Sequence, residues 1–150
     1  MSFSDYFSFE ELCASDYATR HNISNTPDHE VFESIRVLAA GLERVRSVLS
    51  VPMHINSGYR SPKLNSALGG SKNSAHMRGL AADFTAVRLG TPKDICAMIM
   101  THAKEIGFDQ IIQEGAWVHI AFPDAGEEPR YEVLTAKFGS GPTTYERGLG

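Results

Sequence analysis

Hydrophobic residues recur at intervals of three and four positions along one long stretch in the first third of the chain. The recurring positions are Val31, Ile35, Leu38, Leu42, Val45 and Leu49. This spacing places them on one face of an α-helix, so the pattern predicts a helix over about 27–50 that packs on a core. Thr26 is expected to cap the helix and Pro27 to occupy its first position, where a missing N–H costs nothing.

Shorter periodic segments predict the other elements. Helices are expected at 7–15 and at 91–106, the second opened by a capping box at Thr91-Pro92-Lys93-Asp94 and ended by Gly107. Alternation of polar and apolar residues, or short apolar runs, predicts strands at 52–57, 80–85, 108–113, 116–122 and 130–138, the third and fourth forming a hairpin around Glu114-Gly115. Helices come early and strands late, which favours an α+β domain with an antiparallel sheet and flanking helices. We expect a single domain over 1–150, with its core over about 7–138 and a loose tail over 139–150.

Composition narrows the classes of protein. A chain of 150 residues that is 42% hydrophobic with a net charge of −4 suits one folded domain and argues against disorder. No apolar run approaches the ~20 residues that cross a bilayer, and no cluster of Lys and Arg indicates nucleic-acid binding. Cys13 and Cys96 lie far apart and outside any metal-binding spacing, so two reduced thiols are expected. We also expect a monomer, and no signal peptide is recognisable at Met1–Tyr6.

The chain contains six histidines, and the sequence around two of them, His76 and His119, indicates a function. His76 and Asp83 lie seven residues apart, joined by a glycine turn that leads into a predicted strand. His119 lies on another predicted strand, where it shares a face with Trp117. Two histidines and one carboxylate make a catalytic zinc set with the fourth position left to water. The alternative is a loop histidine at 76 and a packed core histidine at 119.

Three segments together resemble a known family. They are Ser57-Gly58-Tyr59-Arg60-Ser61, the run Ser-x-His-x-x-Gly-x-Ala-x-Asp from Ser74 to Asp83, and Trp117-Val118-His119. In order and spacing they are similar to the zinc D-alanyl-D-alanine carboxypeptidases and phage endolysins, murein peptidases that share a fold with the hedgehog signalling domain. Phe-x-x-x-Glu-Leu-x-x-Ser at 7–15 and Asn25-Thr26-Pro27 extend the resemblance to about residues 7–122.

The resemblance implies His76, Asp83 and His119 as ligands of one zinc ion, and Arg60 as the cation that binds the substrate carbonyl or the developing oxyanion. Many relatives carry the general base three residues before the last histidine, where this chain has Ala116. We assign the base to Glu114, the nearest carboxylate, with Asp109 as the alternative. Ser74 either supports the ligand loop by hydrogen bonding or serves only as a turn residue.

The expected function is hydrolysis of an amide bond in the murein stem peptide, by a carboxypeptidase or an endopeptidase. Because no leader segment is recognisable, we expect the protein to stay in the cytoplasm until a phage lysis system releases it to the cell wall, or to be carried by a virion. The alternative is a zinc-containing binding or structural domain without turnover, such as a phage tail or wall-binding component.

Overall fold

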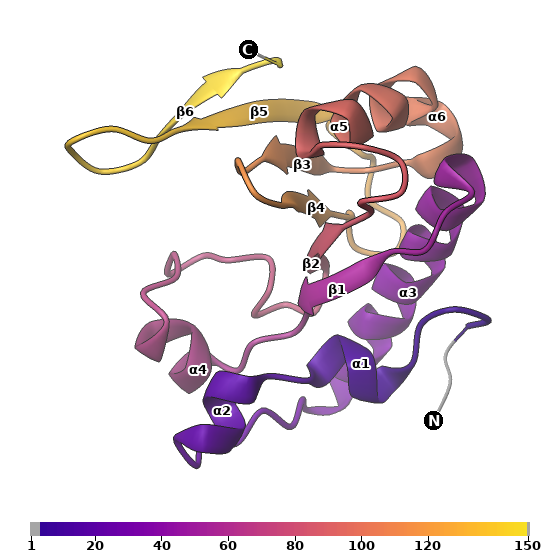
Figure 1. Ribbon diagram of the computed structural model, residues 1–150. Helices are drawn as coiled ribbons and strands as arrows, with labels where there is room; N and C mark the ends of the chain where they lie inside the picture. The colour runs from indigo at the N-terminus through magenta and orange to yellow at the C-terminus, as the bar shows by residue number, and fades with distance from the viewer. Residues whose placement is uncertain (1–3, 150) are drawn as a thin grey trace.

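The computed structural model describes residues 4–149 and consists of helices packed on one mixed sheet (Figure 1). The helices are α1 (Phe9–Cys13), α2 (Asp16–Arg20), α3 (His29–Leu49), α4 (Pro62–Ala67), α5 (Pro92–Thr101) and α6 (Ala103–Ile106). The strands are β1 (His54–Ser57), β2 (Ala81–Thr85), β3 (Gln110–Gln113), β4 (Val118–Ala121), β5 (Glu132–Lys137) and β6 (Thr144–Arg147). This arrangement confirms the predicted α+β class.

The six strands form one sheet in the order β1-β2-β4-β3-β5-β6. Every neighbouring pair is antiparallel except β3 and β5, which run parallel. The predicted antiparallel sheet is therefore confirmed in four of its five strand pairs, and this junction is the exception. The segment between β4 and β5 crosses the start of β3, so β5 begins at the same end of the sheet as β3 and runs parallel to it.

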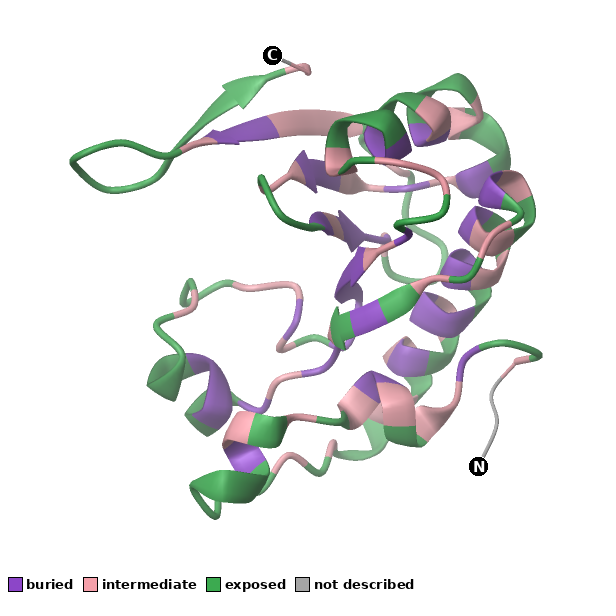
Figure 2. Ribbon diagram, viewed as in Figure 1, coloured by how far each residue is buried: buried purple, intermediate pink, exposed green. Residues whose placement is uncertain are grey.

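One face of the sheet is covered by helices and holds the core. Helices α3, α5 and α6 lie on this side, whereas α4 and the loop after it lie on the other (Figure 1). Alternate strand residues point toward the helices and are buried, among them Phe84, Ile111, Val118 and Ile120. The predicted stripe on α3 packs against them, and its inward residues from Ile35 to Leu49 are buried (Figure 2). The opposite face is thus free to carry polar side chains.

The structure corrects the predicted start of the long helix. Asp28, not Thr26, is the N-cap of α3, and its side chain accepts a hydrogen bond from the Val31 N–H. A carboxylate also interacts favourably with the positive end of the helix dipole, and this favours Asp28 as the cap. The predicted capping box of α5 is confirmed, because Thr91 and Asp94 each accept a hydrogen bond from the other's backbone N–H.

Three further local predictions differ from the structure. Helices α2 and α4 lie in segments for which no helix was predicted, because both are too short to show a periodic apolar stripe. The helix expected over 91–106 is interrupted at His102, which separates α5 from α6. The tail expected to be loose forms β6, which pairs with β5, while Gly150 lies outside the described residues.

Among residues 4–149, no helix has both the length and the apolar character needed to cross a bilayer. The prediction of a single domain over 1–150 stays a prediction, as does the expectation of a monomer.

Candidate metal centre

His76 is held at the end of a tightly turned loop that precedes β2. The Ser74 hydroxyl accepts a hydrogen bond from the His76 N–H at 3.1 Å, which is the supporting role considered for Ser74. The Leu80 N–H reaches back to the Ala75 carbonyl, and Gly79 between them has a φ of +73°. Only glycine adopts such a φ at little cost, so the glycine of the motif allows the chain to reverse after the histidine.

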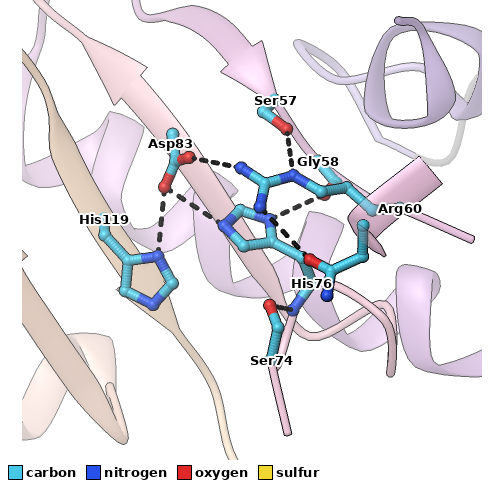
Figure 3. A network of polar contacts seen from close by, with 8 residues as sticks. Ser57, Gly58, Arg60, Ser74, His76, Asp83 and His119 are labelled. Atoms are coloured by element: carbon cyan, nitrogen blue, oxygen red, sulfur yellow. Dashed lines mark hydrogen bonds and ion pairs between the residues drawn. The ribbon is translucent and has the colours of Figure 1, made fainter. Parts of the chain in front are cut away.

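Asp83 and His119 are brought together by strand pairing. They are direct partners in the antiparallel pair β2–β4, so their side chains stand side by side on the sheet face away from the core. His119 Nδ1 lies 3.0 Å and His76 Nε2 lies 3.2 Å from the same oxygen, Asp83 Oδ1. Figure 3 shows the three side chains converging, and their ligand atoms all lie within 4.8 Å of one another.

The ring orientation of His76 is set by a backbone contact. His76 Nδ1 lies 2.8 Å from the Gly58 carbonyl oxygen. A carbonyl oxygen only accepts hydrogen bonds, so Nδ1 carries a proton and Nε2 is the ring nitrogen that faces Asp83. With Nδ1 occupied by the backbone contact, Nε2 is the nitrogen that can bind a metal once it is deprotonated.

Asp83 uses both carboxylate oxygens, one toward each side of the site. Oδ1 faces the histidines, whereas Oδ2 accepts a hydrogen bond from Arg60 Nη2 at 3.2 Å. Burial of this side chain acts to raise the pKa of Asp83, but hydrogen bonds from His119 and His76 outweigh it and hold the pKa below the usual range. Asp83 is therefore a carboxylate, the form that binds a cation, across the physiological pH range.

Arg60 is anchored by three side chains at once. Its Nε donates to Ser57 Oγ at 3.1 Å, its Nη1 to Asn65 Oδ1 at 3.4 Å, and its Nη2 to Asp83 (Figure 3). A guanidinium has five N–H donors in a fixed plane, so one N–H on each Nη remains for another partner. The sequence-predicted cation thus lies beside the metal ligands, positioned by residues from β1 and α4.

Asn25 ties the segment before α3 to the Arg60 turn, a role that sequence reasoning did not assign to it. Its Nδ2 donates to the carbonyls of Cys13 and Tyr59 at 2.8 and 3.0 Å, and its Oδ1 accepts from the Ser61 N–H at 2.7 Å. The available signal was the Asn25-Thr26-Pro27 segment of the resemblance. What that segment contributes is a clamp on the residues that flank Arg60.

Glu114 stands next to the metal cluster on the same sheet face. Ile112 pairs with His119 and Gln113 with Val118, and the Glu114 N–H then donates to the Trp117 carbonyl at 3.0 Å. Glu114 is thus a diagonal neighbour of His119, and such neighbours lie about 7–8 Å apart between Cα atoms. Burial raises the pKa of Glu114, with the His119 side chain acting in the opposite direction. The tight turn therefore brings this carboxylate toward the site.

Asp109, the alternative base, has a different partner. Arg130 holds its carboxylate with the shortest contact, Nη2 to Oδ2, at 2.8 Å. Burial acts to raise the pKa of Asp109, but hydrogen bonds from Arg130 outweigh it and lower the pKa. A carboxylate with this strong ion pair is a weaker proton acceptor than Glu114.

The cluster opens onto a cavity of about 550 Å³. The metal-ligand side chains, Arg60 and Glu114 line it on one side, and the loop over 69–75 borders it on another. Tyr145 and Leu134, from the C-terminal strands, line its far end. Sequence reasoning missed both residues because neither belongs to a motif, and Tyr145 lies in the tail that was expected to be loose.

The donor set fits one zinc ion. Ligand atoms about 2.0–2.1 Å from a tetrahedral ion lie about 3.3 Å from one another, and the contacts of 3.0 and 3.2 Å at Asp83 Oδ1 are close to this spacing. Two imidazole nitrogens and a carboxylate oxygen are ligands that zinc accepts, and Cys13 and Cys96 lie outside the cluster. Three protein ligands facing a cavity define a catalytic zinc centre, in contrast to the closed, four-ligand structural sites.

Comparison with known proteins agrees with this class. Residues 5–121 match the family model described as peptidase M15. The chain belongs to the peptidase M15 family. It is also similar to the zinc D-Ala-D-Ala carboxypeptidase of Streptomyces albus G, with 41% identity over 64 residues. That match covers 43% of this chain but only 23% of the length of the relative.

Proposed function

We propose that this protein is a zinc peptidase that hydrolyses an amide bond in the stem peptides of peptidoglycan. The single observation that carries the proposal is the convergence of His76, Asp83 and His119 on one point at the cavity wall, beside Arg60 and Glu114. The name of the Streptomyces relative and the motif resemblance support D-alanyl peptides as the substrate class.

His76, Asp83 and His119 would hold the ion. Bound zinc supplies Lewis-acid chemistry, polarising a carbonyl and lowering the pKa of water to about 7. Arg60 then directs its remaining N–H donors at the carbonyl oxygen of the scissile bond, where negative charge develops. Donors aimed at such an oxygen are typically worth about 10²–10³ in rate.

Glu114 serves as the proton carrier. Its carboxylate takes a proton from the attacking water and passes it to the leaving amine. The raised pKa of Glu114 suits this role, since a base whose pKa lies closer to neutrality also becomes a better acid in the second step.

Metal content and cleavage test the proposal together. We expect purified protein to contain one zinc ion per chain and to release peptide fragments from peptidoglycan, as seen by mass spectrometry. His76→Ala should lose both zinc and cleavage, whereas the control His54→Ala, which changes an exposed histidine on β1, should retain both. Zinc-free wild type, or cleavage that survives His76→Ala, would contradict the proposal.

A zinc-containing binding domain is the second candidate, and the observation that favours it is Ala116 at the position where relatives carry glutamate. Glu114→Gln separates the two. We expect this variant to keep its zinc and lose at least 100-fold in cleavage rate. A wild type that binds zinc and murein fragments but cleaves none of them would favour the binding domain.

For the biological setting we propose wall degradation by a phage endolysin, supported by the motif resemblance. Purified protein is then expected to reduce the turbidity of a suspension of bacterial cell walls, and chelator should stop the reaction.

A further inference from the structure

The sheet face that carries the metal ligands continues onto the β5–β6 hairpin. This hairpin follows the part of the chain that matches the family model, which ends at residue 121. On this face, paired residues form rows that run across the strands. Asp83, His119, Ile112 and Leu134 make up the row that contains the metal ligands. The cavity follows these rows as far as β6.

The next row contains Glu114 and ends at Tyr145. Gln113 pairs with Thr135, so continuing the register by one residue places Glu114 beside Ala136, and Ala136 pairs with Tyr145. Two strand spacings, about 9.6 Å, separate the backbones at Glu114 and Tyr145. Ala136 has only a methyl side chain, so it does not separate the longer side chains of Glu114 and Tyr145 on either side of it.

Two partly exposed aromatic side chains therefore flank Glu114. Trp117 lies across the hairpin on one side and is 36% exposed, and Tyr145 lies across β5 on the other and is 50% exposed. Both line the cavity. Burial, and then the nearby Glu114 carboxylate, raise the pKa of Tyr145, so its phenol remains a hydrogen-bond donor at neutral pH.

The positions of Arg60 and Glu114 give the bound peptide a direction. Arg60 contacts Asp83 on β2, toward the β1 edge of the sheet, and it binds the carbonyl of the scissile bond in the proposed function. Glu114 follows β3 on the opposite side of the metal ligands and protonates the leaving amine. The leaving part of the substrate thus lies over β3, β5 and β6.

We infer that Tyr145 binds the leaving part of the substrate, and that this end of the cavity accepts a peptide continuing at least two residues beyond the scissile bond. An extended chain advances about 3.3 Å per residue, so the ~9.6 Å from Glu114 to Tyr145 takes between two and three residues. The inference rests on the proposed function, and it assigns an endopeptidase preference to the site.

Steady-state kinetics on two stem substrates test the inference. One substrate is a stem pentapeptide, which loses a single residue, and the other is a cross-linked stem dimer, in which the leaving part is a whole peptide. Tyr145→Ala is expected to raise KM about tenfold for the dimer and to leave KM for the pentapeptide unchanged. Tyr145→Phe, which keeps the ring, should show about a third of that effect or less. Equal effects on the two substrates, or none, would overturn the inference.

Tyr131→Phe is the matched control, because Tyr131 is also exposed but packs against Phe108 and does not line the cavity. It should leave both KM values unchanged.

A binding measurement separates failure of the inference from failure of the proposed function. Trp117 is the sole tryptophan of the chain and lines the cavity, so its fluorescence reports binding there. In the Glu114→Gln background, Tyr145→Ala should weaken binding of the dimer about tenfold, even if the wild type cleaves neither substrate. Dimer binding that is insensitive to Tyr145→Ala would overturn the inference whatever the outcome of the cleavage assay.

Discussion

Asp83 is the residue on which the polar side chains of the site converge. Its Oδ1 lies next to His76 and His119, and its Oδ2 lies next to Arg60. This division separates the metal-binding oxygen from the oxygen that orients the arginine. The same residue therefore fixes the distance between the metal site and the Arg60 guanidinium.

Burial raises the pKa of Glu114, and this predicts how a substitution of Glu114 changes the stability of the fold. The pKa of such a carboxyl group is higher in the folded state than in the unfolded state. The folded state therefore loses stability as the pH rises from the unfolded-state pKa through the folded-state pKa. Glutamine carries no such cost. In metal-free protein at pH 7, Glu114→Gln is therefore expected to unfold at a higher temperature than wild type.

The difference in unfolding temperature should disappear below the ordinary pKa of glutamate, where Glu114 is protonated in both states. Circular dichroism melting curves at the two pH values provide the measurement. As a control, Glu127→Gln changes an exposed glutamate away from the site and should shift neither curve. A lower unfolding temperature for Glu114→Gln at pH 7 would contradict the prediction.

At the scale of elements, the site depends on the turn between β1 and α4. Gly58 lies in this turn, where its carbonyl accepts from His76, and a Cβ at this position would collide with the Leu12 carbonyl. The Tyr59 N–H donates to that same carbonyl at 2.7 Å. The close approach of two backbones explains why this motif position is glycine.

The clamp made by Asn25 predicts a loss of stability on truncation. Asn25→Ala removes three hydrogen bonds between α1, the Arg60 turn and the segment before α3. At about 1 kcal/mol each, less partial replacement by water, we expect the free energy of unfolding to fall by about 2 kcal/mol. Urea denaturation measures the change.

Asn56→Ala is the matched control for that experiment, because Asn56 is an exposed asparagine on β1. We expect a change within about 0.5 kcal/mol for it. A similar small change for Asn25→Ala would show that its hydrogen bonds do not hold the turn.

At the scale of the whole molecule, the sheet separates a packed helical layer from the cavity. Along β2, β3 and β4, the core residues that face the helices alternate with the residues that face the site. The metal ligands come from a loop and two strands far apart in sequence, so bound metal links segments of the fold that unfolding would separate.

Metal removal is therefore expected to lower the unfolding temperature. With free zinc at about 100 times its Kd, binding stabilises the folded state by about 2.7 kcal/mol, which for this size of domain is about 5–10 °C. Differential scanning calorimetry after chelation, and again after zinc is restored, checks this. The His119→Ala protein is the control, and a zinc-dependent shift of equal size in it would place the metal elsewhere.

Local signals in the sequence were enough for α3, α5 and the strands from β1 to β5. The stripe from Val31 to Leu49 predicted α3 because helix periodicity is a property of neighbouring residues. The ligand set came from the resemblance to a known family, which the segment from Ser74 to Asp83 and the histidine at 119 carry.

What the sequence alone left open was decided by contacts between distant segments. The parallel pairing of β5 with β3 and the formation of β6 depend on strand partners far along the chain, and a loose-looking tail carries no local mark of them. For the same reason only the folded sheet places Glu114 beside His119 and Tyr145 at the end of the cavity. The ligands of this protein are thus readable from its motifs, whereas the shape of the space around them comes from strand register.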